Sequence, residues 1–154
     1  MAQTRRNIII GAASLSAVGL VLASRHATAS VGRVYSEDGV AVDGSDVVAY
    51  FERGGPVAGR ADTTHDWKGV TWRFSSDANR AAFVANPDAY APQYGGFCAY
   101  AVSRGYTAST VPEAWRIVDG KLYLNYSRRI QRKWERDIPG NIKAGNANWP
   151  VLLG

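Results

Sequence analysis

A short β-hairpin near the C-terminal third of the chain is the sequence feature that most restricts how the chain can fold. Asp119-Gly120 joins two apolar segments, 115–118 and 121–125. Asp-Gly is favoured in two-residue hairpin turns because both turn residues take positive φ. The segment therefore predicts two antiparallel strands that lie side by side.

A second hairpin is predicted earlier in the chain, where Lys68-Gly69 separates Thr63–Trp67 from Val70–Phe74. In the second of these strands apolar side chains alternate with polar ones, which indicates one buried face. His65 and Trp67 share one face of the first strand, because successive side chains of a strand point to opposite sides. Before this hairpin, Val47–Phe51 fits either a buried strand or one helical turn.

Helix-capping residues predict the helices. Ser75 or Ser76 begins a helix over 77–86 that ends at Pro87, since proline lacks an amide donor. Ser127 begins a second helix over about 128–137, with one apolar side and a basic remainder. A last short helix, 141–148, is expected to end at Trp149-Pro150.

These elements predict a small single α+β domain of β-hairpins and short helices, covering residues 30–154 with its core at about 40–150. Cys98 is the only cysteine, so no disulfide within the chain can stabilise this domain. Aromatic packing is expected to do so instead. The residues expected to share one core are Trp72, Phe74, Phe83, Ile117, Leu122, Leu124 and Trp134.

Residues 1–29 are expected to be an export signal. Arg5 and Arg6 precede the apolar, uncharged run 8–23, and Ala27-Thr28-Ala29 is a small-residue cleavage site. Adjacent arginines are typical of the twin-arginine route, which exports folded proteins. We therefore expect a periplasmic protein that is cleaved near Ala29 and meets the membrane only during export, with an uncleaved membrane anchor as the alternative.

Loss of this leader changes the charge of the protein. The whole chain has a formal net charge of +5, and the leader holds three arginines but no acid. The remaining domain would carry a net charge of about +2, which gives no support to a nucleic-acid partner. The basic helix 128–137 is expected to be a solvated surface, with a surface for phosphate or lipid headgroups as the alternative.

The segment Tyr90–Val102 has the composition of a binding site. Gly95 and Gly96 allow backbone conformations and close approaches that other residues do not. Cys98 follows them at the start of an apolar run, which fits a strand or a short helix. In a helix the thiol would lie in the first turn, where a thiolate is favoured.

Most of the chain after the leader resembles the YHS-domain proteins, in particular small exported members with a twin-arginine signal. The matching segments are Val42–Phe51, Trp72–Ser76, Phe83, Asn86–Tyr90, Tyr94–Ala99 and Asp119–Tyr126. The resemblance implies a small α+β domain. It also implies metal binding, copper above all, because YHS domains occur in copper-transporting ATPases and in multicomponent monooxygenases.

The metal hypothesis uses Cys98 and His65, the only soft ligands of the exported domain. Two ligands are too few for a closed zinc site, but they suit Cu(I). A dimer could instead combine two such pairs into a four-ligand site. Carboxylates could complete a harder site, the candidates being Asp43, Asp46, Asp62 and Asp66.

A metal-free domain that binds a small ligand or a protein partner is the alternative. Its expected pocket is lined by Tyr50, Tyr90, Tyr94, Gly95, Gly96, Tyr100 and Asp46, with Tyr123 as a further candidate. An enzyme with Cys98 as nucleophile and His65 as base, oriented by Asp62 or Asp66, is a third hypothesis. No cysteine-hydrolase signature surrounds Cys98, so no catalytic residue is assigned.

Overall fold

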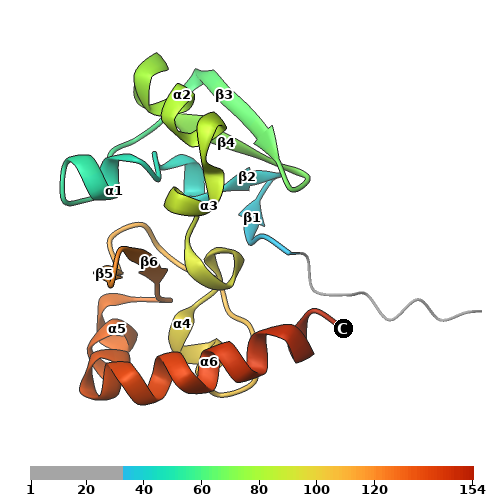
Figure 1. The fold of residues 1–154 in the computed structure, drawn as a ribbon, viewed down its shortest axis with the longest axis vertical. Helices are drawn as coiled ribbons and strands as arrows, with labels where there is room; N and C mark the ends of the chain where they lie inside the picture. Colours follow the sequence, from blue (N-terminus) through green and yellow to red (C-terminus); the bar gives the residue numbers. More distant parts are fainter. Residues whose placement is uncertain (1–32) are drawn as a thin grey trace, which may run out of the picture.

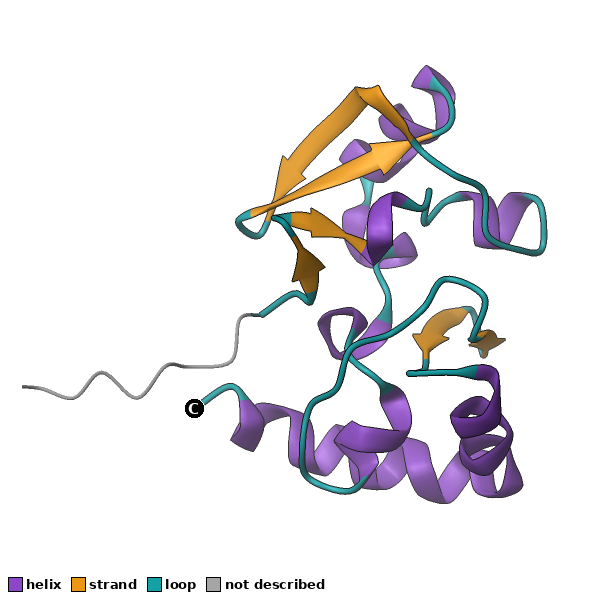
Figure 2. Cartoon of the chain, turned by 180° about the vertical axis from the view of Figure 1, so that it is seen from behind, coloured by secondary structure: helices purple, strands orange, loops and turns teal. Residues whose placement is uncertain are grey.

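The computed structural model describes residues 33–154, and the predicted leader lies outside them (Figure 1). Helices and strands are mixed along the chain, which confirms the α+β class. The fold has two halves, seen from opposite sides in Figures 1 and 2. The sheet half comprises residues 33–92, and the helical half comprises residues 93–154.

The sheet half is built on four strands in the spatial order β1-β2-β4-β3. Its strands are β1 (Ser36–Glu37), β2 (Val40–Ala41), β3 (Arg60–Trp67) and β4 (Val70–Phe74). The predicted hairpin is confirmed, since β3 and β4 pair antiparallel with Trp67 opposite Val70. Lys68 and Gly69 both have positive φ, as the two-residue turn requires. The β2 strand joins the sheet by a parallel bridge between Val40 and Thr71.

Short helices complete this half: η1 (Val42–Gly44), α1 (Ala49–Glu52), α2 (Asp77–Ala85) and α3 (Pro87–Tyr90). The α1 helix decides the open question of residues 47–51 in favour of a helical turn. Ser76 caps α2 as predicted, because its hydroxyl accepts a hydrogen bond from the amide of Asn79 at 3.1 Å. Pro87 ends α2 and becomes the first residue of α3, where its missing amide hydrogen is not needed.

The helical half contains η2 (Gln93–Gly96), α4 (Ala99–Ser103), β5 (Trp115–Val118), β6 (Lys121–Leu124), α5 (Arg128–Trp134), η3 (Glu135–Asp137) and α6 (Ile138–Leu152). The β5–β6 hairpin turns at Asp119-Gly120, and Ser127 caps α5, as the sequence predicts.

The last helix differs from its prediction, because α6 begins at Ile138 and runs through Pro150 to Leu152. Asp137 caps its start by accepting a hydrogen bond from the amide of Gly140 at 3.0 Å. Pro150 lies in the last turn, and Trp149 and Leu152 on either side pack against the buried cluster of this half. That packing outweighs the hydrogen bond that proline cannot donate.

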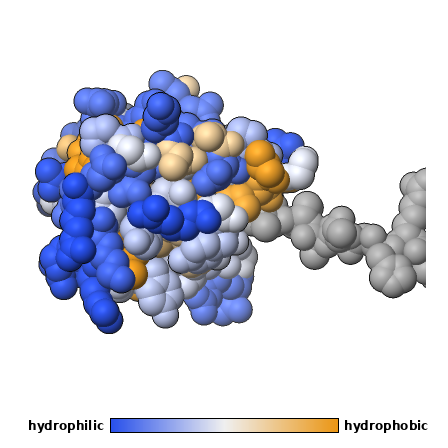
Figure 3. All heavy atoms as spheres, turned by 90° about the horizontal axis from the view of Figure 1, so that it is seen from below, coloured by the Kyte–Doolittle hydropathy of each residue, from blue (hydrophilic) through white to orange (hydrophobic). Residues whose placement is uncertain are grey.

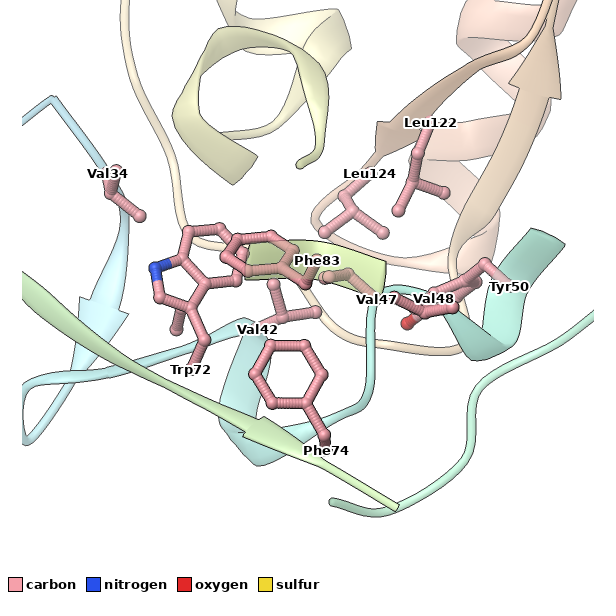
Figure 4. Close-up of a cluster of buried hydrophobic side chains, with 11 residues drawn as sticks. Val34, Val42, Val47, Val48, Tyr50, Trp72, Phe74, Phe83, Leu122 and Leu124 are labelled. Atoms are coloured by element: carbon pink, nitrogen blue, oxygen red, sulfur yellow. The ribbon is translucent and has the colours of Figure 1, made fainter. Parts of the chain in front are cut away.

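Buried apolar side chains form two clusters rather than the single predicted core. The first cluster contains Trp72, Phe74 and Phe83 of the sheet half together with Leu122 and Leu124 of β6 (Figure 4). The second cluster holds Tyr94, Ala99, Val102, Tyr123 and Trp134. Alternate side chains of β6 therefore serve the two clusters, and this strand joins the halves. Within residues 33–154, no helix combines the length and apolar character needed to cross a membrane.

Candidate functional site

Gly95 allows the N-terminal part of the described chain to lie against η2. Its φ is +60°, and a β-carbon at this position would collide with the carbonyl group of Arg33. The amide of Tyr35 donates a hydrogen bond to the Gly95 carbonyl at 2.9 Å. The expected close approach at this glycine is thus made by the chain's own backbone.

The Cys98 thiol is buried directly before α4, with 1% of the residue exposed. Its sulfur accepts a hydrogen bond from the amide of Tyr126 at 3.3 Å and lies 3.6 Å from Oδ1 of Asn125. The backbone amide of Cys98 donates to the Ala108 carbonyl at 3.0 Å. Cys98 therefore connects the start of α4 to the segment after β6, and it has the structural role of a small buried side chain.

His65 lies in the other half of the molecule, on β3, opposite Trp72. Its ring is half-buried with its centroid 6.2 Å from that of Phe83. Figure 1 shows β3 and α4 in opposite halves. His65 packs on Phe83 of the sheet half, whereas the Cys98 sulfur contacts Asn125 and Tyr126 of the helical half, so these contacts do not join the two side chains.

The side chains present do not fit the copper-type centre that the resemblance implies. No group of three or more histidine, cysteine, aspartate or glutamate side chains within residues 33–154 is placed to hold a metal ion. A shared site between two copies would require the Cys98 sulfur to reach the surface, and it is buried. The neighbours of the thiol are an amide side chain and a backbone amide, which are not soft ligands.

Asp46 is fully buried, and its carboxylate is surrounded by hydrogen-bond donors. Its carboxylate accepts from the amides of Val48, Ala49 and Ser75, from the Ser75 hydroxyl and from the side-chain amide of Asn79, at 2.6–3.3 Å. These bonds join the start of α1 to the junction between β4 and α2. Asp46 thus holds the sheet half together and does not line a described pocket.

Within residues 33–154, the tyrosines predicted to line one cleft are dispersed over different parts of the fold. Tyr50 is buried and donates to the Pro112 carbonyl at 2.9 Å, and burial raises the pKa of its phenol. Tyr90 packs edge-on against Phe51 at 5.5 Å. The carbonyl of Gly96 accepts a hydrogen bond from the hydroxyl of Thr110 at 2.8 Å, and Tyr100 lies at a separate pocket in the helical half.

Tyr94 and Gly95 do line a groove, which lies between the two halves and has a volume of about 390 Å³. The sheet half contributes Trp67, Lys68, Trp72 and Asp88, together with Arg33 and Val34. The helical half contributes the end of α6, including Asn146, Trp149 and Pro150. Ligand sites commonly lie at such junctions, in clefts of this size.

Two tryptophans in this groove, one from each half, are held in place by other aromatic rings. The Trp67 ring lies 5.7 Å from that of Trp72 and 5.5 Å from that of Phe83. The Trp149 ring lies 6.0 Å from that of Tyr94 and 5.9 Å from that of Phe97. Aromatic surfaces that are already ordered lose little conformational entropy when a ligand binds.

The groove also carries charge and hydrogen-bonding groups. The ammonium group of Lys68 lies 4.2 Å from the centre of the Trp67 ring and 3.8 Å from the Asp88 carboxylate. The Tyr94 hydroxyl donates to Asn146 Oδ1 at 3.0 Å, and burial raises the pKa of this phenol. Tyr94 and Asn146 are therefore fixed relative to each other, while Arg33 and Lys68 supply positive charge.

Four residues of the groove, Trp67, Trp149, Lys68 and Arg33, were not predicted as site residues from the sequence. Trp67-Lys68 precedes a turn glycine, which marks a hairpin but carries no sign of a binding site. Trp149 reaches the groove only because α6 continues beyond its predicted end. Comparison with protein-family models, with curated proteins and with solved structures finds no match to this chain.

Proposed function

We propose that this chain is an exported YHS-type domain that binds a small organic ligand in the groove between its halves, without a metal. The observation that carries the proposal is the pair Trp67 and Trp149, which belong to different halves and line one groove. Flat apolar parts of a ligand would pack on these rings. Arg33 and Lys68 together outnumber the one acid of the lining, Asp88, which pairs with Lys68, so the groove favours a ligand that also carries a negative charge.

A planar aromatic anion, 1-anilinonaphthalene-8-sulfonate, is a suitable probe of this groove. The processed protein should bind it saturably at one molecule per chain. Trp149→Leu, which keeps an apolar side chain but removes the ring, should weaken binding about tenfold, since an aromatic contact contributes about 0.5–1.5 kcal/mol beyond its buried area.

Tyr126→Leu is the matched control, because Tyr126 is an exposed aromatic residue that does not line the groove. It should leave binding of the probe unchanged. The dispersion of the methyl and amide signals in one-dimensional proton nuclear magnetic resonance spectra should show that both variants keep their tertiary packing. Absent saturable binding, or equal binding by Trp149→Leu and the unmodified protein, would refute the proposal.

Metal content and export are tested separately. Protein purified from the periplasm should contain no stoichiometric copper, and its native mass spectrum should show a retained organic molecule that Trp149→Leu loses. One copper ion per chain that survives dialysis would restore the metal hypothesis. Replacing Arg5 and Arg6 by lysine should block export and processing, as expected for a twin-arginine signal.

A further inference from the structure

The basic residues of the C-terminal region are concentrated on α5 and η3. Five of the ten residues of α5 and η3 are basic: Arg128, Arg129, Arg132, Lys133 and Arg136. Figure 3 shows hydrophilic side chains gathered on the α5 side of the face seen from below, and hydrophobic ones beside the grey trace. The small-ligand groove at the far end of α6 does not involve this basic surface.

Three cations from different elements line one pocket in this region, with a volume of about 410 Å³. Arg104 follows the last residue of α4, Lys133 belongs to α5 and Arg136 belongs to η3. Within residues 33–154, none of the three takes part in an ion pair. The guanidinium of Arg104 lies over the ring of Tyr100, 4.9 Å from its centre, which restricts its orientation.

This pocket has one acid in its lining, Asp137. Its Oδ1 accepts the amide hydrogen of Gly140 and caps α6, and the three cations outnumber its single negative charge. Asn141, also in the lining, donates to the Trp134 carbonyl at 2.8 Å and lies within reach of the Ser103 hydroxyl at 3.3 Å. The pocket therefore has a fixed polar floor and an excess of positive charge.

We propose that Arg104, Lys133 and Arg136 form a binding site for a phosphate-type anion. The planar guanidinium groups can each donate two parallel hydrogen bonds to phosphate oxygens, and the lysine adds a compact positive charge. The same chemistry is supplied by a free phosphate and by the headgroup of an anionic phospholipid. The site uses none of the groove residues and would persist if the groove bound nothing.

The test is a titration of isotopically labelled processed protein with inorganic phosphate, followed by nuclear magnetic resonance. Sodium chloride at matched ionic strength is the reference. Phosphate should shift the amide signals of residues 100–104 and 133–144 in a saturable way. In the double variant Arg104→Gln/Arg136→Gln, binding should weaken at least about tenfold, because two charge-assisted contacts are removed.

The control variant Arg53→Gln/Arg60→Gln removes the same charge from exposed positions of the sheet half. It should bind phosphate like the unmodified protein. A second experiment measures sedimentation with vesicles of phosphatidylglycerol or of phosphatidylcholine. Binding to phosphatidylglycerol alone that the pocket variant loses would identify the headgroup as the source of the anion.

Three results would overturn the proposal. The first is no saturable response to phosphate together with no preference for phosphatidylglycerol. The second is an identical response to chloride, which shows general screening. The third is an equal loss of binding in the pocket variant and in the control variant, which shows dependence on net charge alone.

Discussion

A single carboxylate, that of Asp46, organises the sheet half. It accepts five hydrogen bonds from groups on three segments, and the nearest of these, the Ser75 hydroxyl, lies at 2.6 Å. Hydrogen bonds to a charged acceptor are stronger than neutral ones, and a buried carboxylate without them would be costly. The conformation of residues 46–49 and the start of α2 therefore depend on one another.

Asp46→Asn should lower the free energy of unfolding by roughly 1.5–3 kcal/mol. The side-chain nitrogen of asparagine is a donor and cannot accept a hydrogen bond. At least one of the five groups that now donate to the Asp46 carboxylate would therefore lose its acceptor. Urea unfolding followed by tryptophan fluorescence measures the change.

Asp62→Asn is the matched control for this substitution. Asp62 is exposed and pairs only with its near neighbours Arg60 and Thr63. Its change should stay within about 0.5 kcal/mol, as for most surface substitutions. Equal losses from the two variants would contradict the structural role given to Asp46.

Asp43 should make stability depend on pH in the opposite sense to a paired carboxylate. Burial, and then repulsion from Glu37 and Glu113, raise the pKa of this carboxyl above its ordinary value of 3.8. The folded state thus holds the proton more tightly than the unfolded state does. The contribution of Asp43 to stability is therefore lost as the pH rises from 3.8 through the raised pKa.

Asp43→Asn should accordingly stabilise the protein slightly at pH 7, by no more than about 0.5 kcal/mol. The gain should disappear near pH 3, where the aspartic acid is protonated in both states. Asparagine also tolerates the φ of +48° at this position. Urea midpoints at the two pH values are the measurement, and a loss of stability at pH 7 would contradict the assignment.

At the scale of single elements, α6 depends on a glycine in its interior. A β-carbon on Gly145 would lie 2.5 Å from the Tyr94 hydroxyl oxygen and 2.7 Å from Cζ of the same ring. Glycine in a helix is ordinarily unfavourable by about 1 kcal/mol relative to alanine. The close packing of Tyr94 against α6 explains why glycine is needed here.

Gly145→Ala should therefore destabilise the protein by about 1–3 kcal/mol, although the helix propensity of α6 improves. Ala147→Gly, at an exposed position of the same helix, measures the effect of helix propensity without a change in packing. It should lower the free energy of unfolding by about 1 kcal/mol. Thermal unfolding compares the two. A rise in melting temperature for Gly145→Ala would show that Tyr94 can move aside without cost.

At the scale of the whole molecule, β6 couples the two buried clusters. Leu122 and Leu124 belong to the first cluster, while Tyr123 between them packs on Trp134 in the second, with ring centres 5.2 Å apart. A substitution that loosens the packing of either cluster should therefore affect both halves, because β6 contributes side chains to both clusters. The groove with its two tryptophans exists only while the halves remain together.

Trp134→Ala should lower the free energy of unfolding by about 3–5 kcal/mol, because Trp134 is fully buried. Unfolding should remain a single transition when followed both by fluorescence and by far-ultraviolet circular dichroism. Trp134→Phe should cost less, since it keeps a ring and removes an indole NH that has no partner within residues 33–154. Two separate transitions would show that the halves unfold independently.

Features that depend on a few neighbouring residues could be predicted from the sequence. The turns at Lys68-Gly69 and Asp119-Gly120 and the caps Ser76 and Ser127 belong to this group, and the α+β class follows from the mixture of elements that they delimit. Each depends on φ preferences or on a hydrogen bond that spans only a few residues, so the local sequence is sufficient.

The candidate sites were decided by contacts between distant segments. Cys98 meets Asn125, Tyr94 meets Asn146, and Asp46 meets Asn79, all across 27 or more residues. The same packing separates Cys98 from His65 and carries α6 through Pro150 to place Trp149 in the groove. The sequence by itself determined which side chains could take part in a site. Tertiary packing determined which of these side chains meet, because the free energy gained by burying apolar surface depends on which surfaces pack together and not on the order of residues in the chain.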